Sequence, residues 1–326
     1  MDVSGAPTHE SRRLADHGAA ARTARLVDET AARTAHLARG ALLRWLVLVL
    51  ALTAWQLGAR AHGSVYFPTP ARIARHAYDL WFSGPVGHAF LTPAAVDTIL
   101  PSLGRMAAGF VLAAVVGVGL GILVGRSPRA YALCDPVLQF ARALPPPTLV
   151  PVFVVVFDFG TPMQLASIVF SAVWPVLINT AEGARDTGPL RLDVAAVLRL
   201  TAVERLWFLL LPSALPRIFA GLRLSLSLCL ILMVFSELLP GTANGIGFAL
   251  TDAQSRSDLL TVWAVLVLLG ALGYLLNTGL LAIEKRLTGK RSPGEGPGEG
   301  PEEGSKGSRK SSGKGSRAES RKGRST

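Results

Sequence analysis

The sequence predicts an all-α, polytopic membrane protein with about six transmembrane helices and a disordered basic tail at each end. Three observations lead to this fold class. Half of the 326 residues are hydrophobic, and the mean hydropathy is +0.40. Only 17% of residues are charged, whereas soluble domains carry about 25%. The charged residues gather near the two termini, so the stretch between residues 41 and 284 is apolar enough to cross a membrane several times.

The two tails differ from the middle of the chain in composition. Residues 1–40 are polar and rich in Arg, and residues 287–326 consist mainly of Gly, Ser, Pro, Lys, Arg and Glu. We expect both tails to be disordered, because they hold too few apolar side chains to form a core. Lys and Arg beside apolar spans mark the cytoplasmic side of a membrane, so both termini are predicted to be cytoplasmic.

Two kinds of binding partner, nucleic acid and anionic lipid, could account for the net charge of +11. Nucleic acid is not indicated, because no recognition motif accompanies the charge. The basic C-terminal tail has a composition that contacts anionic membrane lipid, although a solvated tail without a specific role is the simpler interpretation.

The first predicted span covers residues 41–61, which is long enough to cross a bilayer. An outer connection completes a first region, 41–98, and its aromatic residues suit either an interfacial helix or a short helix in a surface loop. The second span, 103–124, is rich in Gly and Ala, which allow close helix contacts in lipid.

The third predicted span, residues 131–157, is interrupted by prolines. We expect the helix to break or bend at Pro145-Pro146-Pro147 and again at Pro151, because proline lacks the backbone donor that a helix needs. Broken helices often line a translocation path, so Pro145 and Pro146 are candidate pathway residues. The remaining predicted elements are spans at 163–180, 213–239 and 259–283, with a glycine-rich outer loop at 240–257.

Two charged residues near the outer ends of predicted spans are candidates for function. Glu237 lies near the outer end of the fifth span, where a charge is costly, so it is a candidate pathway or gating residue or a cap on a neighbouring helix. Arg105 lies near the outer end of the second span and either attracts an anionic solute or extends to the membrane surface. Gly245 and Gly247 are candidates for gating or for tight outer turns.

The connection between the fourth and fifth spans, residues 186–212, contains a predicted amphipathic helix. Asp193 lies in its first turn, where a carboxylate suits the helix dipole. An apolar face follows the helical period, with Leu190, Val194, Val197 and Leu198. A stiff, exposed helix with one apolar face can be gripped by a groove on a partner protein.

This connection resembles the EAA loop of ABC-importer permeases, in which Glu-Ala-Ala is followed by a glycine and a terminal Ile-x-Leu-Pro. The positions that correspond to this motif are Asp193, Val194, Ala195, Arg199, Leu211 and Pro212. Arg199 stands where the family has glycine, so the helix lacks the residue that most often forms its terminal bend. The shape of that bend is therefore left open by the sequence.

Three further stretches resemble the nitrate/sulfonate/taurine branch of this family: Leu211–Arg223, Arg142–Pro151 and Glu237–Gly247. The resemblance covers residues 95–286 and implies the type I importer permease fold in a bacterial plasma (inner) membrane. It implies a cytoplasmic ATPase bound through residues 193–212, an extracytoplasmic solute-binding protein and a second permease subunit, expected to be another copy of this chain. The implied solute is nitrate, a sulfonate, taurine or a related small compound.

Enzymatic motifs are missing from the sequence. It has no zinc-protease or nucleophile-elbow pattern and no phosphate-binding Gly-x-x-x-x-Gly-Lys-Ser/Thr loop. We therefore expect a transporter subunit without its own ATPase activity, cofactor or metal. The alternatives are a secondary transporter driven by an ion gradient, for which six spans and one candidate Glu are few, and a membrane-embedded enzyme.

Overall fold

The computed structural model describes residues 43, 45–88, 90–186, 193, 195–239 and 241–288. Within these residues all regular structure is helical, which confirms the all-α class. The predicted disordered tails, 1–40 and 287–326, lie outside the described residues except for their boundary at 287–288. The predicted domain boundaries remain predictions.

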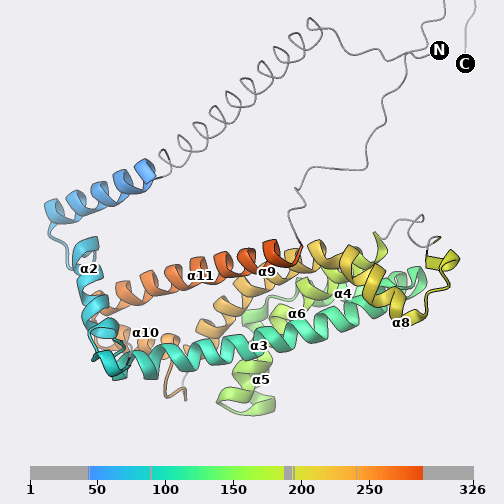
Figure 1. The fold of residues 1–326 in the computed structure, drawn as a ribbon. Helices are drawn as coiled ribbons and strands as arrows, with labels where there is room; N and C mark the ends of the chain where they lie inside the picture. Colours follow the sequence, from blue (N-terminus) through green and yellow to red (C-terminus); the bar gives the residue numbers. More distant parts are fainter. Residues whose placement is uncertain are drawn as a thin grey trace, which may run out of the picture. The chain divides into compact units, whose positions relative to one another are not determined.

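The chain begins, in the part described, with a helix over residues 45–62. The outer connection then forms α2 (Pro70–Ala77), a π-helical turn (Tyr78–Phe82) and a short 3-10 turn (Val86–His88). The long helices are α3 (Pro93–Gly125), α6 (Thr161–Arg185), α9 (Leu211–Glu237) and α11 (Leu259–Leu287). Shorter helices are α4 (Pro128–Ala143), α5 (Pro146–Phe157), α8 (Ala202–Arg205) and α10 (Ile246–Ser255), as Figure 1 shows.

Four helical segments of the described chain are long and apolar enough to cross a membrane: Pro93–Gly125, Thr161–Arg185, Ala202–Glu237 and Leu259–Leu287. The pair α4 and α5 forms a fifth candidate if the two helices together make one bent span. The expected count of about six is therefore not confirmed. The helix at 45–62 is not among these candidates, and the first residues of that predicted span lie outside the described part of the chain.

Several helices are longer than the sequence predicted. The second span was expected from residue 103, but α3 begins at Pro93, where the Thr92 side chain accepts a hydrogen bond from the Ala95 N–H at 3.1 Å. This cap and the proline in the first turn are both favourable helix-start signals. The fifth span was expected from residue 213, but helical structure runs back from α9 through a π-helical turn (Leu206–Leu210) to Ala202.

The predicted break at Pro145 is present, because α4 and α5 meet there at an angle of 91°. Leu144 precedes a proline and is extended, as expected from the steric conflict that proline imposes on the residue before it. At Pro151 the helix does not break, because α5 continues through it. Proline inside an apolar helix is tolerated where neighbouring groups satisfy the backbone that it frees.

The outer loop predicted at 240–257 contains the helix α10. Gly241 and Gly245 have φ angles of 91° and 120°, which glycine adopts without strain, so these two positions do form turns. In the other outer connection, α2 packs against α11, and Ile73 and Trp81 are buried. The two connections that were predicted to be outer are therefore structured segments that pack on the long helices.

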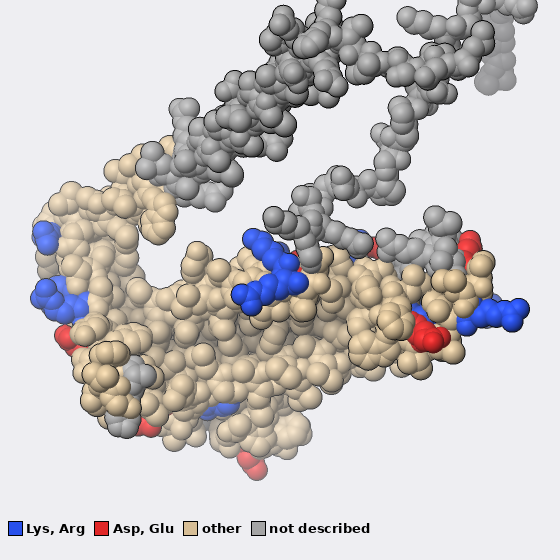
Figure 2. Space-filling model, in the orientation of Figure 1, with Lys and Arg blue, Asp and Glu red and all other residues tan. Residues whose placement is uncertain are grey.

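The core forms where α6 packs between α3 and α9. One face of α3 carries glycines that contact α6: Gly109, Gly117, Gly121 and Gly125. Glycines in such a row let two helix backbones approach closely, which is the main source of helix association in lipid. The opposite sides of α3 and α11 expose large apolar side chains, and the face seen in Figure 2 is mostly uncharged, as expected for helices surrounded by lipid.

We expect Gly121→Ala to destabilise the protein by about 1–3 kcal/mol, the usual cost of overpacking. A Cβ atom at position 121 would lie 2.6 Å from the Thr180 Cβ atom and 2.7 Å from the Leu177 carbonyl oxygen. Gly119→Ala is the matched control, because nothing lies within 4 Å of its added Cβ atom and alanine favours a helix. Thermal unfolding in detergent measures the stability of both variants. An equal loss of stability in the two would contradict the close packing of α3 on α6 at Gly121.

Candidate functional site

The two ends of the α6–α9 pair carry different groups of predicted site residues. The 186–212 connection joins the C-terminal end of α6 to the N-terminal end of α9. Glu237 lies at the other end of α9, close to the N-terminal parts of α3 and α6. We call the first group the coupling segment, residues 193–212, and the second the outer network, which comprises Ser102, Arg105, Gln164, Glu237, Asn244 and the backbone of Ile246 and Gly247.

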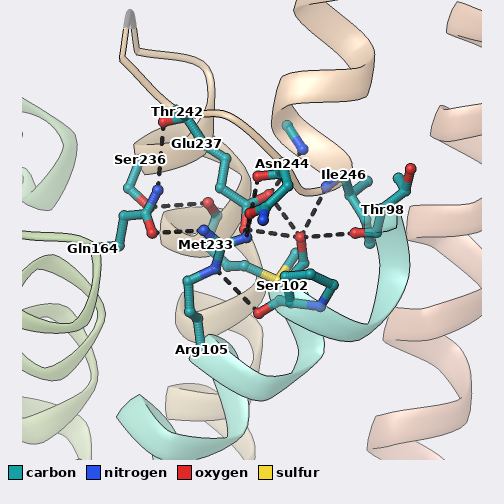
Figure 3. A network of polar contacts seen from close by, with 12 residues as sticks. Thr98, Ser102, Arg105, Gln164, Met233, Ser236, Glu237, Thr242, Asn244 and Ile246 are labelled. Carbon is teal, nitrogen blue, oxygen red and sulfur yellow. Dashed lines mark hydrogen bonds and ion pairs between the residues drawn. The ribbon is translucent and has the colours of Figure 1, made fainter. Parts of the chain in front are cut away.

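The outer network is centred on the Glu237 carboxylate, which is only 1% exposed. Its Oε1 atom lies 3.0 Å from Nη2 of Arg105. Ser102 Oγ lies 2.8 Å from both carboxylate oxygens and donates its one proton to this group. Figure 3 shows that these side chains point toward one another from different helices. A buried charge requires partners of this kind, because its desolvation is otherwise uncompensated.

The same carboxylate caps the N-terminus of α10. The Gly247 N–H donates to Glu237 Oε2 at 2.9 Å, and the Ile246 N–H donates to Ser102 Oγ at 2.8 Å. These are the first two N–H groups of α10, which have no acceptor within their own helix. A carboxylate at this position is also favoured by the helix dipole. Of the two interpretations of Glu237, the cap on a neighbouring helix therefore describes its geometry.

Arg105 points into the protein, with its side chain only 10% exposed. Besides Glu237, it donates from Nη1 to Gln164 Oε1 at 2.8 Å and from Nη2 to the Asn244 carbonyl at 3.1 Å. Its Nε atom donates to the Pro101 carbonyl at 3.1 Å. Each of the three guanidinium nitrogens therefore has a protein acceptor, and together they join α3, α6, α9 and the turn before α10.

Gly245 and Gly247 lie so close to Glu237 that neither position has room for a side chain. A Cβ atom at Gly245 would lie 2.5 Å from Glu237 Oε2, and one at Gly247 would lie 2.5 Å from Glu237 Cβ. The structure thus brings Glu237 and Arg105 together with both glycines. Pro145 and Pro146 are not part of the network and lie at the bend between α4 and α5.

Sequence reasoning missed three members of the network: Ser102, Gln164 and Asn244. Ser102 lies three residues before Arg105, and this spacing places two polar side chains on one face of α3. That signal was available in the sequence. Gln164 and Asn244 come from distant parts of the chain, and no local pattern links them to Glu237.

The coupling segment begins with a short helix at residues 195–197, and Val194 lies outside the described residues. Asp193 is exposed, whereas Ala195 is only 3% exposed and packs inward. Val197 and Leu198 are 82% and 63% exposed. The apolar side of this helix is therefore split between one residue that packs on the protein and two that face outward.

Arg199 forms the helix-ending bend that the family assigns to glycine. Its φ angle is 49°, in the left-handed region. The Leu200 N–H donates to the Ala195 carbonyl and the Arg199 N–H donates to the Ala196 carbonyl, both at 3.1 Å. This pair of hydrogen bonds defines a Schellman motif. The bend is therefore retained despite the missing glycine, at a conformational cost of about 1–2 kcal/mol.

A capping box starts the second half of the coupling segment. Thr201 Oγ1 accepts a hydrogen bond from the Glu204 N–H, and the Glu204 carboxylate accepts one from the Thr201 N–H. From this start, α8 continues through the π-helical turn into α9, which begins at Leu211 and Pro212. The Thr-x-x-Glu spacing at 201–204 could have predicted this helix start, but the loop was expected to extend to residue 212.

Comparison with protein families places the chain. Residues 117–289, more than half of the chain, match the family described as binding-protein-dependent transport system inner membrane component. The chain therefore belongs to this family, and it is a permease subunit of an ABC importer. This result confirms the family predicted from the motifs, together with its multi-pass place in the inner membrane.

Three relatives illustrate the branch of the family. The bicarbonate transport system permease protein CmpB of Synechocystis is 36% identical over 60% of this chain and 69% of its own length. The nitrate import permease protein NrtB of Synechocystis is 32% identical over 73% of this chain and 86% of its own. A putative aliphatic sulfonates transport permease protein, SsuC of Bacillus subtilis, is 32% identical over 74% and 85% respectively. These relatives agree with the predicted nitrate/sulfonate/taurine branch.

We expect Arg105→Gln to destabilise the protein by about 3–5 kcal/mol, because it leaves the buried Glu237 charge without its ionic partner. Replacing both residues, Arg105→Gln with Glu237→Gln, should recover part of that loss. Arg256→Gln is the control, since its ion pair with Asp252 is on the surface. The stability of all three variants is measured by unfolding in detergent. An Arg105→Gln variant as stable as the control would contradict a stabilising ion pair between Arg105 and Glu237.

We expect Arg199→Gly to stabilise the end of the 195–197 helix, because glycine adopts the left-handed conformation without steric cost. Arg199→Val should have the opposite effect, since a β-branched residue is strongly disfavoured there. Hydrogen–deuterium exchange of residues 195–200 measures both variants. Faster exchange in the glycine variant than in the wild type would refute the role of this bend.

Proposed function

We propose that this subunit forms part of the translocation path for a small solute that carries an oxyanion group, and that its coupling segment binds the cytoplasmic ATPase. The named substrates of the relatives, bicarbonate, nitrate and aliphatic sulfonates, share this chemistry. Taurine, which was also expected from the sequence, carries a sulfonate as well. An extracytoplasmic binding protein would deliver the solute to the outer face.

The observation that carries the coupling role is an exposed apolar surface on the coupling segment, which we call the coupling patch. Its residues are Val197, Leu198, Val203, Trp207 and Phe208, all between 61% and 82% exposed. Large apolar side chains gathered on a polar connection mark a binding surface. A short helix with two outward apolar residues suits a groove on the ATPase.

The coupling segment is joined to the outer network by continuous helix. Helical structure runs from Ala202 to Glu237, 36 residues, with no break between the capping box and the Glu237 carboxylate. A helix of this length extends about 54 Å. Movement of the ATPase at the coupling patch would therefore act directly on α9 and, through Glu237, on α10 at the other end.

The proposed assembly contains further partners. The sequence has no phosphate-binding loop, so a separate subunit would hydrolyse ATP. The exposed apolar sides of α3 and α11 would face membrane lipid and a second permease subunit, most simply another copy of this chain. With the coupling segment on the cytoplasmic side, both termini would lie on that side too, as the basic residues of the tails suggest.

An ion-gradient-driven secondary transporter is not favoured. Among the described residues, Glu237 is the only fully buried acid. Its oxygens are occupied by Arg105, Ser102 and the N-terminus of α10. A carboxylate that carries a proton or an ion across the membrane must release these partners in each cycle. The fixed network supports a structural role for Glu237 instead.

We expect the double substitution Val197→Asp and Leu198→Asp to weaken ATPase binding by about tenfold or more, since two buried interface contacts would become charged. Co-purification of the ATPase and ATP-driven uptake in reconstituted vesicles measure the loss. Val65→Asp is the matched control, because Val65 is 79% exposed on the outer connection. Full ATPase binding by a well-folded double variant would sink the proposed coupling role.

A further inference from the structure

A cavity of about 690 Å³ opens beside the coupling segment. It lies between the turn after α3, the C-terminal end of α6, and the α8–α9 region. Six charged residues line it: Arg126, Glu182, Arg185, Asp186, Arg205 and Arg217. The cavity is therefore surrounded by four positive and two negative side chains.

Both carboxylates of the cavity are bound to the same arginine. Arg217 donates from Nη1 to Glu182 at 3.3 Å and from Nη2 to Asp186 at 2.8 Å. Within the described residues, Arg126, Arg185 and Arg205 form no ion pair. The cavity thus carries a surplus of positive charge.

Arg185 is stacked on an aromatic ring, and none of the described residues accepts a hydrogen bond from its guanidinium. Its guanidinium carbon lies 3.9 Å from the centre of the Tyr131 ring, a stacking contact between α6 and α4. Stacking engages the face of the guanidinium and leaves the N–H groups at its edge available. A planar fork of N–H donors that is fixed by stacking is well suited to bind the oxygens of an oxyanion.

We propose that this cavity binds an oxyanion group between Arg126, Arg185 and Arg205 and that the bound group restrains the coupling segment. The three arginines belong to the turn after α3, to α6 and to α8. Because α8 is part of the coupling segment, an anion shared among them would hold that segment against the inner ends of α3 and α6. Oxyanion binding should therefore slow ATP-driven movement.

The bound oxyanion group could come from either of two molecules on the cytoplasmic side: a free oxyanion, or an anionic lipid whose headgroup carries a phosphate. A free anion would make the site a sensor of cytoplasmic oxyanion, the class of solute that the importer is proposed to accumulate. The claim that a bound anion slows transport rests on the proposed function. The claim that the cavity binds an anion is independent of it.

The test measures binding of radiolabelled sulfate to the full chain in nanodiscs of phosphatidylcholine at constant ionic strength. We expect saturable binding that weakens by about tenfold or more in the variant Arg126→Gln with Arg205→Gln, since each charged hydrogen bond contributes substantially. Arg256→Gln, on the outer side, is the matched control and should bind as the wild type does. Equal binding by the double variant would overturn the proposal.

A second arm uses nanodiscs that contain phosphatidylglycerol. If the lipid headgroup occupies the cavity, sulfate binding falls in these discs and the double variant loses its preference for phosphatidylglycerol, which supports the site with lipid as its source. If neither sulfate nor phosphatidylglycerol binds in a manner that depends on Arg126 and Arg205, the site does not exist.

A third arm adds the ATPase. In the assembled complex, sulfate should slow ATP hydrolysis in the wild type and not in the double variant. Loss of ATPase attachment in the double variant, without any sulfate binding in the wild type, would show that the cavity receives an acidic group of the ATPase and would refute the oxyanion site. Sulfate binding that persists when the ATPase does not assemble would count against the proposed function alone.

Discussion

The buried carboxylate of Glu237 is the constraint on which the outer half of the protein depends. A charge removed from water and lipid headgroups costs several kcal/mol unless fixed partners compensate it. Those partners come from α3 through Arg105 and Ser102 and from the N-terminus of α10. Arg105 adds α6 through Gln164. The ends of four helices therefore keep one arrangement, because any of them that moved away would leave a charge or a donor unpaired.

Close packing carries this constraint along the length of the helices. The glycine face of α3 lies with its backbone against α6. On the other side of α6, a Cβ atom added at Gly221 of α9 would lie only 2.8 Å from the Pro175 carbonyl oxygen. Such contacts allow little sliding, because there are no flexible side chains between the backbones. The three helices therefore form a rigid unit, and the continuous helix from Ala202 connects that unit to the coupling segment.

The sequence predicted the features that arise from local chemistry. Composition predicted the all-α membrane class, and Pro145 predicted the bend between α4 and α5. The assignment of residues 193–212 to ATPase coupling, which rests on motif spacing, stays a prediction. The sequence did not predict α10, whose N-terminus is capped by Ser102 from 144 residues away. It also left open the bend at Arg199, which depends on hydrogen bonds that hold an unfavourable residue in place. Structure that depends on distant partners has no local signature.

The two ends of the molecule use arginine in opposite ways, and this difference indicates where regulation can act. In the outer network, every nitrogen of the Arg105 guanidinium already donates to a protein acceptor, so a ligand that took its place beside Glu237 would have to displace buried bonds. At the inner end, Arg126 and Arg205 face a cavity in which both carboxylates are already bound to Arg217. A ligand gains free energy only from donors that are not already satisfied. The end that carries Glu237 is therefore built to hold its arrangement. The other end, beside the coupling segment that we propose binds the ATPase, is the one that a bound anion would bias.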